Sequence, residues 1–200
     1  MLSTTRVKNR NDGRLIHAVY AGDIKTVQSE LAQGDIDLQL KFRGKSFLRH
    51  AGELGHSLIV SYLLKSGANP NERQGATNYT LLHSAVASHN YGFARLLLEN
   101  GAELSPRNSH LATPLHFAAR LDQAYLAQLL IGKRADIEAR DSHGRTPLFL
   151  ALAKGNKQVA RTLVSAKANA NAINDRGQTA RRVAENNGID LSDESFSFLF

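Results

Sequence analysis

The sequence predicts an all-α protein built of stacked repeats, because residues of one type return every 33 or 34 positions along most of the chain. Three columns of residues carry this period. The first consists of alanines, the second of Ser or Thr, and the third of residues that tolerate a left-handed backbone. Their members are Ala18, Ala51, Ala85, Ala118, Ala151 and Ala184; Ser46, Thr80, Thr113, Thr146 and Thr179; and Gly22, Gly55, His89, Asp122, Gly155 and Gly188.

Each column predicts one part of a helix pair. Thr113 stands before Pro114, which suits an N-cap followed by proline at the first helical position, where the missing N–H costs nothing. The alanine column lets neighbouring helices approach closely, and the third column ends the first helix in a left-handed turn. A second apolar helix then runs through residues 124–130 at helical spacing. A unit this short cannot bury its own apolar face, so its stability comes from its neighbours.

The unit Thr113-Pro114-Leu115-His116-Phe117-Ala118-Ala119 resembles the ankyrin repeat, whose mark is T-P-L-H-x-A within a 33-residue period. The resemblance covers roughly residues 12–190 and is to small, stand-alone ankyrin-repeat proteins of the bacterial type. It implies an ankyrin-repeat solenoid of about five to six repeats, degenerate caps included. Each repeat would hold two antiparallel helices and be joined to the next by a projecting β-hairpin finger.

The columns also predict boundaries. We expect full repeats near 42–73, 76–108, 109–141 and 142–174, a degenerate first repeat at 12–40 and a partial last repeat from Asn174. The domain organisation would be a mobile basic arm at 1–11, one ankyrin-repeat domain at 12–191 and a hydrophobic tail at 192–200. The single extra residue falls between Arg73 and Thr80, which predicts a longer finger there.

Two repeats depart from the pattern at the end of the second helix. Arg134 and Lys167 occupy the column in which Gly67 and Gly101 stand. A residue with a side chain in a left-handed turn costs on the order of 1 kcal/mol. The sequence therefore leaves the local geometry of these two turns open.

Composition limits the class of protein. The 200 residues are 42% hydrophobic but contain no apolar run near 18 residues, so we expect no membrane span. The absence of Cys excludes disulfides and thiolate zinc sites. No signal peptide is visible at the start of the chain. A cytoplasmic location is the default expectation, with an exported or periplasmic form processed from a longer precursor as the alternative.

Catalytic and cofactor chemistry is not expected. The resemblance implies that His83 and His116, in the T-P-L-H column, tie one repeat to the next by hydrogen bonds. His50 and His56 are six residues apart, which does not place them on one helix face at ligand spacing. Neither a nucleophile elbow nor a phosphate-binding glycine loop occurs. We therefore predict that the chain is not an enzyme and takes no metal, cofactor or small-molecule substrate.

The net charge of +7 is concentrated in the expected fingers. Five of the seven excess positive charges lie on residues 39–45, 72–79, 106–112, 139–145 and 172–178. The simplest interpretation is a set of solvated hairpin tips, and the alternative is a basic rim that attracts an acidic partner. Nucleic-acid binding is a weaker possibility: the pI near 9.9 would suit it, but the chain has no Trp and no Lys/Arg row interleaved with aromatic residues.

The resemblance implies that a partner lies in a concave groove formed by the finger tips and the first helix of each pair. Carried over by column, and with the rim cations added, the predicted partner-binding residues are Phe42, Arg43, Lys45, Leu54, Tyr79, Arg107, His110, Arg120, Leu121, His143, Arg145, Lys154 and Arg176. Phe42 and Tyr79 would be apolar anchors, because interfaces concentrate binding energy on buried aromatic residues and Arg. The structural alternative is that Phe42 and Leu54 cover each other and repair a second repeat in which Phe47 and Arg49 replace the Pro and His.

The end of the chain is unusually apolar. Phe196, Phe198 and Phe200 lie in the last five residues together with Leu199. They would either fold over the open end of the last repeat or form an aromatic peptide that docks into a partner.

These features predict a protein-binding module that carries no chemistry of its own. We expect it to be monomeric alone and to bind a protein with an acidic surface, possibly an enzyme. Occlusion needs only one interface, so an inhibitor or regulator, such as a self-protection (immunity) factor, is the favoured function. A scaffold that bridges two proteins is the second hypothesis and nucleic-acid binding the third.

Overall fold

The computed structural model describes residues 10–33 and 36–188, and these fall into two compact units. Unit 1 consists of Met1–Glu72 and Gly92–Ala102, and unit 2 of Arg73–Tyr91 and Glu103–Phe200. The predicted basic arm and aromatic tail lie almost wholly outside the described residues, so those two predictions stay predictions. The predicted division into one domain with an arm and a tail likewise stays a prediction.

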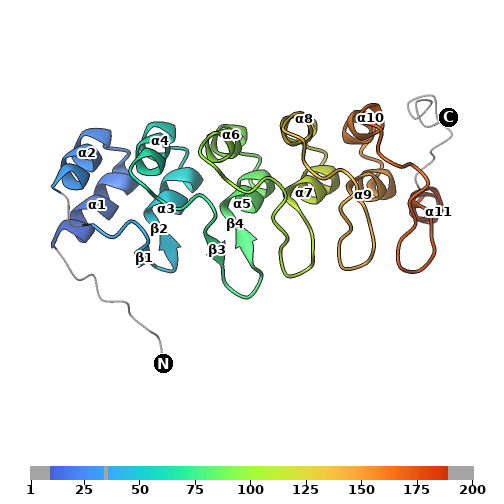
Figure 1. Cartoon of the computed structure of the whole chain (residues 1–200), viewed down its shortest axis with the longest axis horizontal. Helices are drawn as coiled ribbons and strands as arrows, with labels where there is room; N and C mark the ends of the chain where they lie inside the picture. Colours follow the sequence, from blue (N-terminus) through green and yellow to red (C-terminus); the bar gives the residue numbers. More distant parts are fainter. Residues whose placement is uncertain (1–9, 34–35, 189–200) are drawn as a thin grey trace. The chain divides into compact units, whose positions relative to one another are not determined.

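The described chain is made of helices with two small strand pairs (Figure 1), which confirms the all-α repeat architecture. Unit 1 contains α1 (Arg10–Ala21), α2 (Ile24–Ala32), β1 (Lys41–Phe42), β2 (Lys45–Ser46), α3 (Phe47–Glu53), α4 (Ser57–Lys65) and, except for its first residue, α6 (Tyr91–Glu99). Unit 2 contains β3 (Arg73–Gln74), β4 (Tyr79–Thr80), α5 (Leu81–Ala87), α7 (Pro114–Arg120), α8 (Ala124–Gly132), α9 (Pro147–Lys154), α10 (Lys157–Ser165) and α11 (Ala180–Asn186). The described part of the chain thus holds eleven helices.

The first helices begin at the Ser/Thr column, as predicted. Thr80, Thr146 and Thr179 cap α5, α9 and α11, and each side-chain oxygen accepts the N–H of the residue three positions later. Thr113 and Ser46 are the N-caps of α7 and α3. Proline occupies the first turn of α7 and α9, where no helical N–H is needed.

The helix ends also follow the sequence. All six residues of the predicted left-handed column have positive φ, from 53° at Asp122 to 77° at Gly55. Arg134 and Lys167 keep positive φ as well, at 71° and 70°. The geometry left open by the sequence is therefore the same turn as in the glycine-containing repeats, at the local cost of a side chain in that region.

The repeats pack through the alanine column. In unit 2, α7 packs against α5, α8 and α9, and α9 packs against α10 and α11. In unit 1, α1 packs against α2 and α3, and α4 against α2 and α3. Ala51, Ala85, Ala118, Ala151 and Ala184 are no more than 1% exposed, so the small side chain is required for this close packing.

The fingers differ from the expected set of identical hairpins. β1 pairs with β2 and β3 with β4, both antiparallel, and four residues separate Gln74 from Tyr79 where two separate Phe42 from Lys45. The predicted lengthening of the second finger is thus confirmed. The other three fingers contain no strand pair among their described residues beyond one bridge, Ile173 to Thr179.

The three later fingers close around a side chain instead. Asn108, Asp141 and Asn174 are buried, and the Oδ1 of each accepts the N–H groups two and four residues later. Each finger also donates one N–H to the finger before it: Ser109 to Thr77, Ser142 to His110 and Asp175 to His143, at 2.8–3.0 Å. The fingers of unit 2 therefore form one hydrogen-bonded row along the side from which the first helices start (Figure 1).

Candidate functional site: the finger side of unit 2

The two histidines of the T-P-L-H column in unit 2 hold repeats together. His83 and His116 each contact their own N-cap threonine through Nδ1, and their Nε2 atoms lie 3.0 Å from the carbonyl oxygens of Ala112 and Arg145. Burial lowers the pKa of His83 to about 4, opposed in part by the Ala112 carbonyl. Burial likewise lowers the pKa of His116. Both imidazoles are therefore neutral structural groups, as the resemblance implied.

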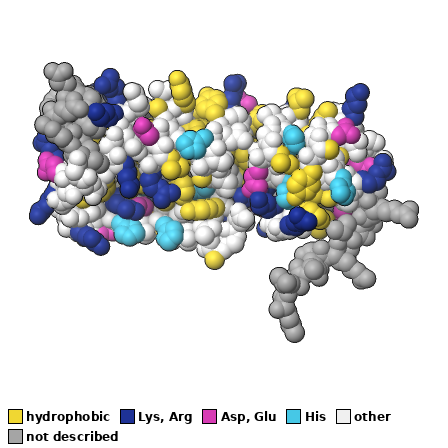
Figure 2. All heavy atoms as spheres, turned by 180° about the vertical axis from the view of Figure 1, so that it is seen from behind, with side chains coloured by type: hydrophobic (Ala, Val, Ile, Leu, Met, Phe, Trp, Pro, Cys, Tyr) yellow, Lys and Arg dark blue, Asp and Glu magenta, His cyan; other side chains and the backbone are white. Residues whose placement is uncertain are grey.

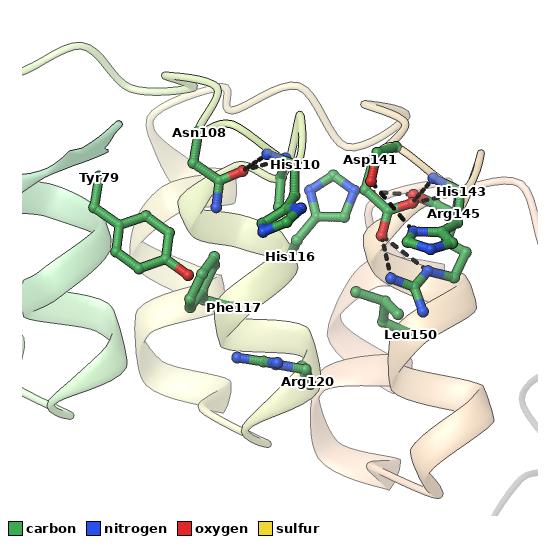
Figure 3. A pocket seen from close by; sticks show the side chains of 12 residues that line it. Tyr79, Asn108, His110, His116, Phe117, Arg120, Asp141, His143, Arg145 and Leu150 are labelled. Atoms are coloured by element: carbon green, nitrogen blue, oxygen red, sulfur yellow. Dashed lines mark hydrogen bonds and ion pairs between the residues drawn. The ribbon is translucent and has the colours of Figure 1, made fainter. Parts of the chain in front are cut away.

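A first hollow of about 260 Å³ opens along the fingers at 72–79, 106–112 and 139–145 (Figure 3). Five predicted partner-binding residues line it, namely Tyr79, His110, Arg120, His143 and Arg145. The edge of Phe117 and the side chain of Leu150 contribute its apolar wall. The repeat places these residues together because each occupies the same position in successive fingers or first helices.

Aromatic stacking orders one wall of this hollow. The Tyr79 ring is stacked on His83 at 5.6 Å and meets Phe117 edge-on at 5.4 Å. The guanidinium carbon of Arg120 lies 5.1 Å from the centre of the Phe117 ring (Figure 3), a cation–π contact. Tyr79 is thus half-buried and has a structural contact, which the sequence did not indicate for a water-facing column.

A second hollow of about 550 Å³ follows directly on the first. Four residues of the predicted set line it: His143, Arg145, Lys154 and Arg176. Its apolar side is formed by Phe149 and Leu150, and its end by Val183 of α11 and the C-cap residue Asn187. The two hollows have Ser142, His143, Arg145 and Leu150 in common. They are therefore neighbours divided by the finger at 139–145.

Ion pairs within the protein take up much of the charge that the sequence assigned to a basic rim. Lys41, Lys45, Arg73, Arg140 and Arg145 pair with Glu72, Glu53, Glu103, Asp175 and Asp141. At Asp141 burial raises the pKa, but hydrogen bonds from Arg145 and from the N–H of His143 outweigh it, so the pKa is lowered overall. This carboxylate stays charged and neutralises Arg145 inside the first hollow.

A row of arginines bonds each finger to the next. Arg73 donates to the carbonyl of Arg107, Arg107 to that of Arg140, and Arg140 to that of Ile173, at 3.0–3.1 Å. Arg107, predicted to meet a partner, thus has a bond to the main chain of the following repeat. The sequence could have indicated this, because the three arginines keep the 33- or 34-residue period and the column ends at Ile173.

Three cations that face the hollows form no ion pair in the part of the chain that the structure describes, and the acidic residues beside them, Asp141 and Asp175, are paired with Arg145 and Arg140. Arg120 and Lys154 stand at the ends of α7 and α9, and Arg176 at the tip of the last finger. All three are exposed. Figure 2 shows one face of the molecule, on which basic and histidine side chains lie beside exposed hydrophobic ones.

The remaining predicted residues lie outside these two hollows. Phe42 belongs to unit 1, where it is half-buried against Tyr20 and His50 at centroid distances of 6.5 and 6.3 Å. Arg43 lies over the Phe42 ring, and Leu54 is 45% exposed. Leu121 is the half-buried C-cap residue of α7. Of the two rings that Phe42 contacts, Tyr20 comes from the neighbouring first repeat and His50 from its own repeat, and the contact with Tyr20 was not among the alternatives that the sequence suggested.

Neither a metal-binding cluster nor a membrane-spanning helix is found in the described ranges. Residues 10–33 and 36–188 contain no cluster of three His, Asp or Glu side chains arranged to hold a metal ion. None of the helices in those ranges is long and apolar enough to span a bilayer.

A family model of ankyrin repeats, described as three copies, matches residues 15–108 and 106–174, which is more than half of the chain. The chain belongs to the ankyrin-repeat family. Ankyrin repeats are protein-binding modules that in general carry no catalytic residues, so this chain is a protein–protein interaction module.

Three curated proteins are similar to it over single stretches. The mouse Ankyrin repeat and SOCS box protein 6 is 38% identical over 68 residues, which is 34% of this chain and 16% of that protein. The Arabidopsis thaliana E3 ubiquitin-protein ligase KEG is 35% identical over 60 residues, 30% of this chain and 4% of that protein. The human Diacylglycerol kinase iota is 32% identical over 108 residues, 52% of this chain and 10% of that protein. This chain therefore spans no more than about a sixth of these relatives, and they leave the bacterial type unconfirmed.

Proposed function

We propose that this ankyrin-repeat protein binds a partner protein through the two basic hollows on the finger side of unit 2, and that it inhibits or regulates that partner by covering its working surface. The observation that carries the proposal is the set of three exposed cations, Arg120, Lys154 and Arg176, that face two adjoining hollows and form no ion pair among the described residues. An acidic surface on the partner would supply the missing charges. An enzyme whose active-site entrance is acidic is the concrete form of this partner.

The hollows suit recognition rather than catalysis. Their polar groups are fixed by bonds within the protein, such as those of Asp141 to Arg145 and of Asn108 to the main chain of its finger. A rigid surface loses little conformational entropy on binding, so more of the contact energy appears as affinity. Inhibition would follow from steric occlusion and requires no reactive group from this chain.

A scaffold is the second candidate function, because unit 2 has another hollow with different lining. Tyr91, Tyr125, Gln123 and Leu126 contribute to a cavity of about 300 Å³ at the turns between first and second helices. Tyr125 is 79% and Tyr91 44% exposed, which is unusual for large apolar side chains. A protein that bridges two partners needs two such surfaces.

The test compares two lysines of unit 2 that differ in position only. Lys154→Gln removes a cation from the second hollow, and Lys133→Gln removes an exposed cation from the C-terminal cap of α8. We expect partners captured from a native extract, identified by mass spectrometry, to be lost with Lys154→Gln and kept with Lys133→Gln. The activity of an enzyme found in this way should fall when the purified wild-type chain is added. Capture that is equal for both variants would contradict the proposed surface, and an unchanged activity would favour the scaffold.

A further inference from the structure

We infer that the two hollows of unit 2 bind one extended segment of the partner, in which two acidic side chains flank an apolar one. This inference rests on the proposed function and names the kind of partner that the same site takes. It follows from three features of the hollows: their continuity, the alternation of charge along them, and the distance between successive repeats.

Continuity comes from the residues that line both hollows. Ser142, His143, Arg145 and Leu150 form the boundary between them, and no other finger intervenes. In Figure 3 His110, His143 and Arg145 lie on the finger side. Tyr79 and Phe117 lie next to each other, and Arg120 lies on the helix side. A single stretch of chain can therefore pass from the first hollow to the second over this boundary.

Charge alternates along this path. At the first hollow Arg120 is held over the Phe117 ring, 5.1 Å from its centre, and forms no ion pair among the described residues. At the boundary Arg145 is neutralised, because its Nε and Nη2 atoms lie 2.8 and 2.7 Å from Asp141 Oδ2. At the second hollow Lys154 and Arg176 form no ion pair in the described ranges, and Asp175, the acidic residue of its lining, is paired with Arg140 at 3.5 Å.

The complementary segment is therefore acidic, then apolar, then acidic. The first carboxylate would meet Arg120 and the second would meet Lys154 and Arg176. Over the boundary a carboxylate would meet the neutralised Arg145–Asp141 pair and gain no charged contact, whereas an apolar side chain would contact Leu150. A polyanion with evenly spaced charges, such as a nucleic-acid backbone, fits this alternation less well, because one of its charges would fall opposite this neutral pair.

The spacing of the two acidic residues follows from the repeat. Arg120 and Lys154 stand at the ends of α7 and α9, which pack directly on each other. Packed helices lie roughly 8–10 Å apart, and an extended chain in the polyproline II conformation advances roughly 3.1 Å per residue and returns to the same side every three residues. The two acidic side chains should therefore be about three residues apart.

The test uses short synthetic peptides and the full chain. One peptide contains Glu-Leu-Ala-Glu between glycines, a second has the same composition in the order Leu-Glu-Glu-Ala, and a third has Gln in place of both Glu. Binding is measured by the change in polarisation of a fluorophore on each peptide at low and at moderate salt. We expect the spaced peptide to bind about tenfold more tightly than the adjacent isomer, which corresponds to one good charged contact. The Gln peptide should bind more weakly than either.

Two variants of the protein then locate the site. Lys154→Gln should abolish the difference between the spaced and the adjacent peptide, and Lys133→Gln should leave it unchanged. Equal binding of the two Glu peptides by the wild-type chain would overturn the inference. If that result occurs while partner capture still depends on Lys154, the proposed function stands and only the acidic–apolar–acidic segment is wrong. If capture is also independent of Lys154, both are wrong.

Discussion

The second repeat and the two repeats after it solve the same problem with different chemistry. In the third and fourth repeats, His83 and His116 are the last residues of the Thr-x-x-His motif, and each contacts a carbonyl of the next finger. In the second repeat Arg49 occupies that column and is only 1% exposed. Its Nε lies 3.9 Å from Glu72, which also accepts a hydrogen bond from the N-cap residue Ser46. A neutral imidazole has been replaced by a buried charge with a carboxylate beside it.

The comparison teaches that this column needs a buried polar group with a partner rather than a particular residue. Burial lowers the pKa of Arg49, and the nearby Glu72 opposes that effect. A buried ion pair contributes little net stability while it is intact, but loss of one member leaves a charge without compensation. The second repeat should therefore be the more fragile of the two when a single residue is changed.

The largest effect is expected for Glu72→Gln in unit 1. The variant keeps the size of the side chain but removes the negative charge beside Arg49, which should cost about 3–5 kcal/mol of unfolding free energy. Denaturant unfolding followed by circular dichroism measures this. Glu103→Gln is the matched control, since Glu103 pairs with Arg73 at an exposed site and should cost less than about 1 kcal/mol. Equal costs for the two variants would show that the pair at Arg49 has no special burial penalty.

A smaller loss of unfolding free energy is expected on acidification. It distinguishes the repeats with a buried histidine from the repeat with a buried arginine. The pKa of His83 is lowered to about 4 in the folded state, against a usual value near 6.5 when unfolded. The unfolded chain therefore binds a proton first, so the stability that His83 contributes is complete above pH 6.5 and is lost as the pH falls towards 4. The loss from this residue should approach roughly 3 kcal/mol.

His83→Gln tests the origin of this slope. Gln can still donate to the Ala112 carbonyl but does not titrate, so the variant should be less stable at pH 7 and lose less stability between pH 6.5 and 4. The second repeat has Arg49 in place of this histidine and so contributes no imidazole titration to the slope. The same pH dependence in wild type and variant would mean that another group, of which His116 is the first to examine, is responsible.

Most of the fold could be predicted from the sequence, because a repeat shows each structural decision several times. The left-handed column, the Ser/Thr caps and the longer second finger were all visible as spacing. The pairing of strands in each finger was not, because Asn108, Asp141 and Asn174 close their fingers through side-chain oxygens. These three residues keep the 33-residue period, so the signal was present but was not used.

The candidate site was predicted less completely, because a column position does not reveal what a side chain contacts. Tyr79, His110, Arg120, His143 and Arg145 do line one hollow. Arg107 is bonded to the main chain of the next repeat, and Arg145 to Asp141. Counting charges in the fingers could not distinguish these from Arg176 and Lys154, since long side chains reach partners several residues away.

The smallest effect is expected from Arg107, and it distinguishes a structural arginine from a partner-binding one. Arg107→Met keeps the aliphatic stem but removes the bond to the Arg140 carbonyl, which should lower the unfolding free energy by about 1 kcal/mol. Arg176→Met is the matched control, since Arg176 lies in the second hollow and forms no ion pair among the described residues. Its removal should leave stability within about 0.5 kcal/mol of the wild type.

The two variants should affect partner binding in the opposite order, because of these two arginines only Arg176 lines the second hollow. Affinity for a captured partner should fall with Arg176→Met, and the remaining affinity should depend less on salt. Arg107→Met should change neither quantity beyond the effect of its lower stability. If Arg107→Met weakens binding as much as Arg176→Met while the protein stays folded, the partner also covers the row of arginines that joins the fingers. The interface would then extend beyond the two hollows to the outer edge of the fingers.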